Sequence, residues 1–525
     1  MNQVFYIEEL IQRIAFNVGD GSPGSATLLA LACCCKTLEV PIMDVLWQRQ
    51  RFLRIILQTL SADCWTITGK IYVSGNISRS SKPLILPAIQ HVTRSPTTNE
   101  WERFRRYAAR VVQLFVGKTY NGSVWEASSE NISFLGIRST LDPLRPRLTT
   151  LRLGGGLGWD TVQSTLTFLS PKVTSLTLAL PGEGNILLQL ILSIASDRCH
   201  SLQEFVLSVN FGDPDSANGV GRLISACRDT LRSLEIGSPC KKEYLPIIAN
   251  LPHLRSLRLQ GIHFPCDLPS NAFPSLEDIT VLNFHGKQLP HFFSHLRTTG
   301  LEVVGVRGDI DAIAFKELMA ALSRFSASLR TLKVLAVANL DLPNVGVPHP
   351  LFANLRYLRV GCPCAGVGLD GPCAFRPTDQ AVAELGVVMP NIARLTLGSP
   401  TCPTPQRPTF LSLVSLSKTC RDLETLTIEV DFQTMVAPSL NDNGDVEMDA
   451  TSDGIQDNPC KLHTLFVGLS ALPDHLESGW IVAIGFGKLF PSLSAVTGCS
   501  SNRHKWEKVG RNIRMLRQVL RTVKQ

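Results

Sequence analysis

The stretch Leu254-Arg255-Ser256-Leu257-Arg258-Leu259 is one copy of a short phrase that decides the fold of this 525-residue chain. The phrase has apolar residues at its first, fourth and sixth positions. The last two apolar residues are two positions apart, so in an extended strand both side chains lie on one face. Other clear copies lie at Leu148-Leu151-Leu153, Leu202-Phe205-Leu207, Leu231-Leu234-Ile236, Leu329-Leu332-Val334, Leu355-Leu358-Val360 and Leu423-Leu426-Ile428.

The spacing of the copies indicates a leucine-rich-repeat array, in which each unit contributes one short strand that stacks on its neighbours. Weaker copies begin at Val173, Leu276, Leu301, Ile392 and Leu462, and outer copies begin at Val111, Ile132 and Leu493. Such arrays usually carry Asn or Cys three residues after the last strand position, and here only Asn210 fits. We therefore expect an α/β solenoid that is irregular and unevenly curved.

The segments between copies predict helices. Apolar residues recur with helical period over 186–194, 220–227 and 310–325, and Asp309 is the expected N-cap of the last of these. Several units return to the strand through an apolar residue and a proline, as in Leu251-Pro252, Phe273-Pro274, Met389-Pro390 and Phe490-Pro491. Proline cannot continue a helix, so each unit reads as helix, turn and strand.

Composition restricts the class of protein. The chain is 44% apolar and 18% charged, and no apolar run approaches the roughly 18 residues of a membrane span. Glu8 and Glu9 stand where a secretory signal would be basic. The 15 cysteines are an odd number and lie mostly within apolar phrases, as expected of reduced thiols in a core. We expect a cytoplasmic or nuclear protein with no membrane contact.

The first 58 residues follow a different pattern, that of three short helices in tight succession. Their order, EELIQRIAF followed by LLALACCCKTLEVPIMDVLWQ, resembles an F-box of the kind found in mushroom-type fungal proteins. The matching positions are Leu31-Ala32-Cys33, Leu38, Pro41, Leu46 and Trp47, and Trp101-Glu102-Arg103-Phe104 continues the likeness. The Leu-Pro start of that family is absent, since Ile7-Glu8 occupies its place. Without the resemblance, the module reads as a helical cap on the solenoid.

The resemblance implies a substrate-recognition subunit of a Skp-cullin-F-box ubiquitin ligase. Its partner would be the Skp-type linker protein of a cullin-RING ligase, and its repeats would bind a protein client. The residues expected to form or support the linker-docking surface are Leu10, Ile14, Leu31, Cys35, Leu46 and Trp47. The alternative is a leucine-rich-repeat scaffold that never joins a ligase.

The expected organisation has four parts. Residues 1–58 form the F-box-like module, 59–110 a connector, 111–502 the solenoid and 503–525 a basic amphipathic helix that caps it. Segment 437–459 contains six acidic residues and no basic one, so it is expected to be a disordered insertion. The basic tail is expected to seal the solenoid rather than to bind nucleic acid or a membrane surface.

Recognition is the expected chemistry, rather than catalysis. No HExxH, GxSxG or phosphate-loop motif is present, and we expect no enzyme activity and no cofactor. Cys362, Cys364, Cys373 and Cys402 match no standard zinc spacing, so no metal site is expected. The outward strand positions include basic residues that predict a positive client-binding strip for an acidic or phosphorylated segment: Arg258, Arg307, Lys333, Arg359 and Arg394. The alternative is a solvated charged face with no partner.

Overall fold

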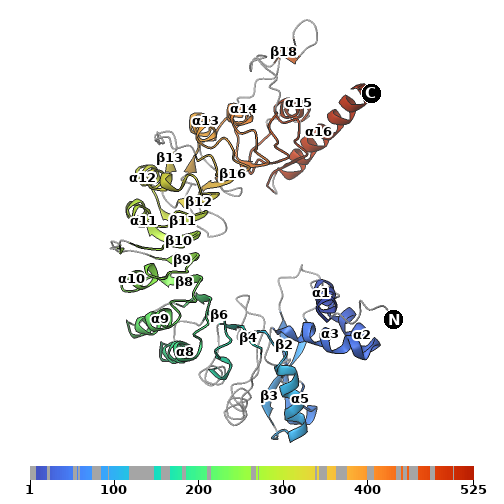
Figure 1. Cartoon of the computed structure of the whole chain (residues 1–525). Coiled ribbons are helices and arrows are strands. Elements are labelled where there is room, and N and C mark those ends of the chain that lie inside the picture. The colour runs from blue at the N-terminus through green and yellow to red at the C-terminus, as the bar shows by residue number, and fades with distance from the viewer. Residues whose placement is uncertain are drawn as a thin grey trace. The chain divides into compact units, whose positions relative to one another are not determined.

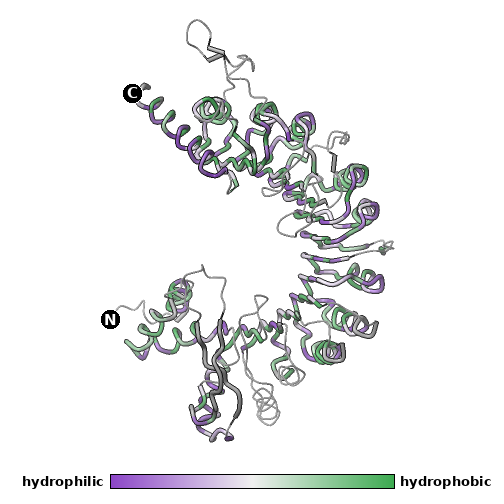
Figure 2. The backbone as a smooth tube through the Cα atoms, turned by 180° about the vertical axis from the view of Figure 1, so that it is seen from behind, coloured by the Kyte–Doolittle hydropathy of each residue, from purple (hydrophilic) through white to green (hydrophobic). Residues whose placement is uncertain are grey.

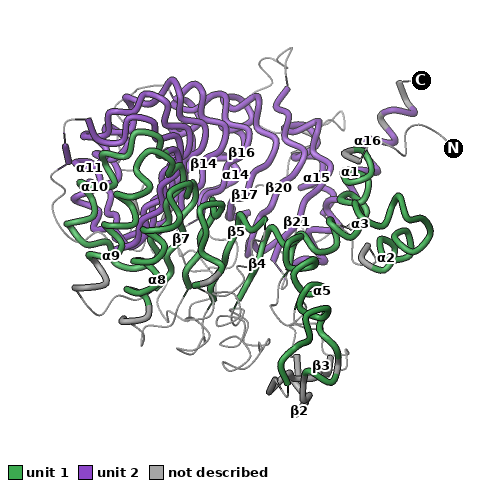
Figure 3. Tube along the Cα trace, turned by 60° about the horizontal axis from the view of Figure 1, so that its bottom comes forward, with its two compact units in different colours: residues 1–254 green, residues 255–525 purple. Residues whose placement is uncertain are grey.

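The structure is a computed structural model that divides into two compact units, Met1–Leu254 and Arg255–Gln525 (Figure 3). Each unit combines parallel strands with helices. The residues that the structure describes are 8–19, 24–50, 56, 59–73, 84–92, 94–116, 147–154, 166–179, 185–209, 214–261, 268–269, 271–336, 340–341, 352–361, 375–398, 407–432, 439–440, 446–447, 459–472, 479–499 and 502–524.

A parallel sheet runs through the first unit. In pairing order its strands are β1 (Arg49–Gln50), β4 (Gln113–Val116), β5 (Thr150–Leu153), β6 (Ser175–Leu178), β7 (Glu204–Leu207) and β8 (Ser233–Pro239). The apolar positions of the phrase are in register, so Leu151 pairs with Leu176, and Leu176 with Phe205. Three helices lie along one side of these strands: α8 (Asn185–Arg198), α9 (Pro214–Ala226) and α10 (Tyr244–Ala249) (Figure 1).

The second unit repeats this arrangement. Its parallel strands are β9 (Ser256–Gln260), β10 (Asp278–His285), β11 (Val303–Asp309), β12 (Thr331–Ala336), β14 (Tyr357–Gly361), β16 (Arg394–Leu397), β17 (Thr425–Ile428), β20 (Thr464–Phe466) and β21 (Ala495–Thr497). Its helices are α11 (Leu289–His295), α12 (Ala312–Leu322), α13 (Asp379–Val388), α14 (Phe410–Thr419), α15 (Trp480–Leu489) and α16 (Arg503–Lys524). This confirms the predicted repeating α/β architecture.

The core lies between strands and helices, where the phrase residues are buried. Leu254, Leu257 and Leu259 are exposed by 0%, 1% and 0%, and the residues between them face outward. Hydrophobic and hydrophilic residues alternate along the strands and around the helices (Figure 2). Each repeat therefore completes its apolar interior only by stacking on the next one.

The proline turns and the helix starts have distinct outcomes. Leu251, Phe273, Met389 and Phe490, which precede the prolines, are all buried at the return to the strand, as predicted. The N-cap prediction at Asp309 is wrong, because Asp309 ends β11. Asp311 caps α12 instead, and its carboxylate accepts a hydrogen bond from the Ala314 amide at 2.8 Å. The two aspartates flank Ile310, the first residue of the apolar stripe, and only the length of β11 distinguishes them.

Hydroxyl and thiol groups link neighbouring repeats. The hydroxyl of Thr230 donates to the Leu202 carbonyl at 2.8 Å, and that of Ser328 donates to the Leu301 carbonyl at 2.9 Å. The Cys227 thiol donates to the Cys199 carbonyl at 3.3 Å, and the Cys460 thiol to the Cys420 carbonyl at 3.2 Å. These short side chains bond backbone carbonyls of the preceding repeat. Asn210, the single residue that fits the usual pattern, lies outside the described residues.

The N-terminal part of the first unit precedes most of the sheet. It contains α1 (Glu8–Gly19), α2 (Gly24–Cys34), α3 (Lys36–Gln48), an antiparallel pair of β2 (Trp65–Val73) and β3 (Leu84–Val92), and α5 (Thr98–Ala108). The first sheet strand, β1, follows α3 directly, within the range assigned from sequence to the helical module. The antiparallel pair of β2 and β3 occupies part of the expected connector.

Several sequence expectations concern residues on which the structure says little. The four clustered cysteines 362, 364, 373 and 402 lie outside the described residues, as does the outer copy that begins at Ile132. Within 437–459, the described residues form a short antiparallel pair of β18 (Ser439–Leu440) and β19 (Val446–Glu447). No helix in the described part of the chain has both the length and the apolar character needed to cross a bilayer.

Candidate interaction surfaces

The three N-terminal helices form a small core of their own. Ile11 and Ala15 of α1, Leu28 and Ala32 of α2, and Ile42 of α3 are buried together. Large apolar side chains nevertheless remain on the outside of the same helices: Leu10 is 37% exposed, Ile14 52%, Leu29 54% and Val40 52%. Leu10 and Ile14 are four residues apart, so they share a face of α1.

The six predicted linker-docking residues fall into two groups. Leu10 and Ile14 are exposed, whereas Leu31, Cys35, Leu46 and Trp47 are half-buried. Leu31 and Leu46 pack against the small core. Hydrogen bonding from Thr37 lowers the pKa of the Cys35 thiol, which stands at the start of α3. Of the six, only Leu10 and Ile14 therefore belong to the exposed apolar surface of the module.

Trp47 contacts a different part of the first unit. Its ring lies 4.7 Å from the ring of Tyr107 in α5, measured between centroids. Near this contact, Asp44 pairs with Arg110 at 3.0 Å and with Arg147 at 3.8 Å. These contacts could not be predicted from local sequence patterns, because Tyr107, Arg110 and Arg147 lie far along the chain from α3. Trp47 thus holds the helical module against α5.

An ion cluster fixes the start of α5. The Arg94 guanidinium contacts Asp63 at 2.6 Å and Glu100 at 2.8 Å, and Thr97 and Glu100 form a capping box. Hydrogen bonding from Arg94 holds the pKa of Glu100 well below its usual range. The Cys64 thiol is 3.8 Å from Glu100, so Asp63, Cys64 and Glu100 could present ligand atoms to a metal. Because Arg94 already pairs with both carboxylates, we interpret the cluster as structural.

The five predicted client-binding cations share the outward face of the second unit's sheet, but they do not form one straight row. Lys333 of β12 pairs in register with Arg359 of β14. Arg307 pairs with Leu335, one outward position further along, and Arg394 pairs with Tyr357, one outward position earlier. Four cations on consecutive strands therefore form a diagonal, which we call the cationic diagonal: Arg307, Lys333, Arg359 and Arg394.

Arg258 stands apart from the cationic diagonal. It pairs with Thr280 of β10, which in turn pairs with Gly305 of β11. Two uncharged positions therefore separate Arg258 from Lys333 in the same row. The row follows the phrase, since Arg258, Thr280, Gly305 and Lys333 each stand between the last two apolar residues of their copies, which pair in register.

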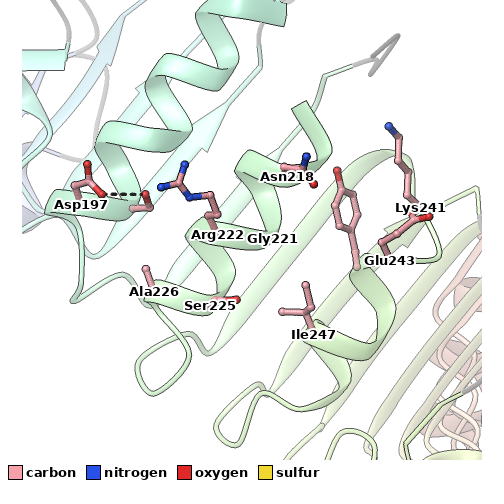
Figure 4. Close-up of a pocket in the computed structure, with 11 residues that line it drawn as sticks. Asp197, Asn218, Gly221, Arg222, Ser225, Ala226, Lys241, Glu243 and Ile247 are labelled. Atoms are coloured by element: carbon pink, nitrogen blue, oxygen red, sulfur yellow. Dashed lines mark hydrogen bonds between the residues drawn. The ribbon is translucent and has the colours of Figure 1, made fainter. Parts of the chain in front are cut away.

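An open groove lies among the helices of the first unit (Figure 4). Its volume is about 970 Å³, and 11 residues line it from the end of α8, from α9 and from the start of α10. Arg222 and Lys241 are balanced by Asp197 and Glu243, so the lining carries no net formal charge. The Tyr244 hydroxyl is buried and has no hydrogen-bond partner, and burial raises the pKa of Tyr244. The lining holds no histidine and no cysteine, and its Ser196 hydroxyl donates to the Ser193 carbonyl at 2.7 Å and to the Asp197 carboxylate at 3.5 Å.

Comparisons with known proteins do not place the chain in a family. No protein-family model matches the chain, and no curated protein matches it. Among solved structures, the chain is similar to one in the crystal structure of the Rad7 and Elc1 complex in yeast. The identity is 19%, and the alignment covers 57% of this chain and 80% of that chain with a TM-score of 0.32. A likeness of this size carries no argument about function or partners.

Proposed function

We propose that this chain is a non-catalytic substrate-recognition subunit of a Skp-cullin-F-box ubiquitin ligase. Its N-terminal helices bind a Skp-type linker protein, and its repeats hold a protein client. The action is by proximity, because a client held on the repeats has a raised effective concentration near the ligase's transfer enzyme. Such a receptor needs no catalytic residue of its own.

The observation that carries the proposal is the exposed apolar surface of the helical module. A three-helix unit that buries Ile11, Leu28 and Ile42 could also cover Leu10 and Ile14, yet it leaves them outside. Exposed large apolar residues on several elements of one small module are typical of a protein interface. The ring contact between Trp47 and Tyr107 supports the same role, because it fixes the helical module against α5.

The test is capture of a purified Skp-type linker protein by the full-length chain. The double variant Leu10→Glu with Ile14→Glu should weaken capture at least about 100-fold, since each buried side chain contributes roughly 1.5–3 kcal/mol. Ile313→Glu on α12 is the matched control, because Ile313 is 71% exposed but lies in the second unit. If the unmodified chain captures no linker, the ligase role fails and the scaffold alternative stands.

A further inference from the structure

The cationic diagonal places four like charges on four consecutive strands. Lys333 and Arg359 are direct neighbours in register, about 5 Å apart at the backbone. Arg307 and Arg394 each lie one strand and two residues further, at roughly 8 Å from Lys333 and Arg359 respectively. Like charges directly opposite each other destabilise a sheet. Local folding therefore gives no reason for this arrangement.

Cations just before the strands of this sheet, unlike those of the cationic diagonal, form ion pairs with acids. Arg255 pairs with Glu277 at 3.6 Å, and Arg330 pairs with Glu302 at 3.9 Å. Asp422 pairs with both Arg356 at 3.2 Å and Lys461 at 2.8 Å. Cations and acids are thus paired at the strand beginnings. No described acidic group makes such a pair with Arg307, Lys333, Arg359 or Arg394.

Among the described residues, two guanidinium groups of the cationic diagonal have an Nε atom without an acceptor. The Nε atoms of Arg307 and Arg359 are shielded from solvent and have no hydrogen-bond partner. Lys333 leans over the Tyr357 ring, with its Nζ 5.5 Å from the centroid. One acid faces Lys333 from β10: burial raises the pKa of Asp278, while Lys333 lowers it. Asp278 balances part of the Lys333 charge and leaves the three arginines unmatched.

We propose that the cationic diagonal binds the oxyanions of an extended acidic or phosphorylated segment of another protein, an assignment that rests on the proposed role of the repeats as a client-binding surface. Arginine suits carboxylate and phosphate groups because its planar donors contact two oxygens at once. The diagonal is roughly 20 Å long, from three strand spacings and two double steps along the strands, so about six extended residues span it. Two oxyanions four to five residues apart would reach both halves.

The test uses the full-length chain and fluorescein-labelled Gly/Ser decapeptides, read by fluorescence anisotropy. One peptide carries two phosphoserines five positions apart, a second carries glutamates there and a third carries serines. We expect the phosphoserine peptide to bind best and the serine peptide not to bind. Arg307→Gln and Arg359→Gln should each weaken binding about tenfold, as expected for loss of one charge-assisted contact.

Two variants serve as matched controls. Arg258→Gln removes a cation from the same sheet face but off the diagonal, and Arg330→Gln removes one that is paired at the strand beginning. Both should change affinity less than about twofold by the same reasoning. Equal losses in Arg258→Gln and Arg359→Gln would mean a diffuse positive surface and would overturn the site. The site would also be overturned if none of the peptides bound. The same holds if single-stranded RNA or anionic vesicles bound more tightly than the peptides and were weakened by the same variants.

Linker capture by the same variants separates this inference from the proposed function. Arg307→Gln and Arg359→Gln should capture the Skp-type linker as the unmodified chain does. Peptide binding without linker capture would retain the oxyanion site and reject the ligase role. Linker capture without peptide binding would do the reverse.

Discussion

Replacement of Trp506 by alanine should loosen the C-terminal end of the second unit. Trp506 is fully buried near the start of α16, and its ring lies 5.0 Å from Phe432 and 6.5 Å from Phe486, measured between centroids. Its Nε1 donates to the Ser470 carbonyl at 3.0 Å. Val509 and Ile513 continue the buried face of the helix over β21 (Ala495–Thr497).

The size of the effect follows from this burial. A buried Trp or Phe replaced by Ala costs about 3–5 kcal/mol, which corresponds to a roughly 100- to several-thousand-fold loss of protection against amide exchange. Trp506→Phe retains most of the ring contacts and loses the hydrogen bond, so it should cost about 1–2 kcal/mol. Repeat arrays open locally, so exchange at individual segments is more informative than a global melting point.

The assay is hydrogen exchange by mass spectrometry on the full-length chain. Peptides from β20, β21 and α16 should lose protection in Trp506→Ala, while those from the first unit should not change. Trp480→Ala is the control, because Trp480 is 41% exposed and belongs to the neighbouring helix α15. Comparable losses in the two variants, or protection retained in Trp506→Ala, would refute the claim that Trp506 anchors α16.

Three further predictions concern the first unit. The stabilisation of α5 by Glu100 should be constant above the ordinary carboxyl pKa of about 4.3 and should disappear as the pH falls toward the lowered pKa of the folded state. Amide exchange of α5 measures this stabilisation, and its pH dependence should be lost in Glu100→Gln but retained in Glu102→Gln. Tyr244→Phe should leave the urea midpoint unchanged or raise stability by about 1 kcal/mol, since the hydroxyl has no partner; a clear loss would reveal a hydrogen bond there. Burial raises the pKa of Cys227 to about 11 and that of Cys199 to about 12. At pH 8 iodoacetamide should therefore modify the exposed Cys33 and Cys34, and it should not modify the two buried cysteines until urea unfolds the chain. Rapid labelling of Cys227 in the native protein would contradict this.

The repeat phrase was sufficient to predict the strands of the parallel sheet from β4 onward and their buried faces. Leu332 and Val334 are two residues apart and apolar, and both are fully buried in β12. Register also follows the phrase, because its copies pair in phase although the segments between them differ in length. Arg307 follows the last apolar residue of its copy, Lys333 lies between the last two and Arg394 precedes the second, and they accordingly lie at different levels of the sheet.

Contacts between distant segments could not be predicted from the sequence. Trp47 fits the F-box-like pattern of a docking residue, but its ring packs on Tyr107, which no local pattern connects with it. The short strand β1 carries no copy of the phrase, and about 60 residues separate it in sequence from β4, with which it pairs. Pattern arguments see neighbours along a strand or a helix, and both of these contacts are tertiary.

The pairing of β1 with β4 has a practical consequence for dissecting the protein. Arg49 pairs with Gln113 and Gln50 with Leu114, and the Val112 amide donates to the Gln48 carbonyl at 2.9 Å. A truncation that removes the first 58 residues would strip this strand away and leave β4 as an open edge, ready to associate with other chains. Aggregation of such a fragment would then be mistaken for a lost partner. Point substitutions on α1 keep the edge covered and separate the two effects.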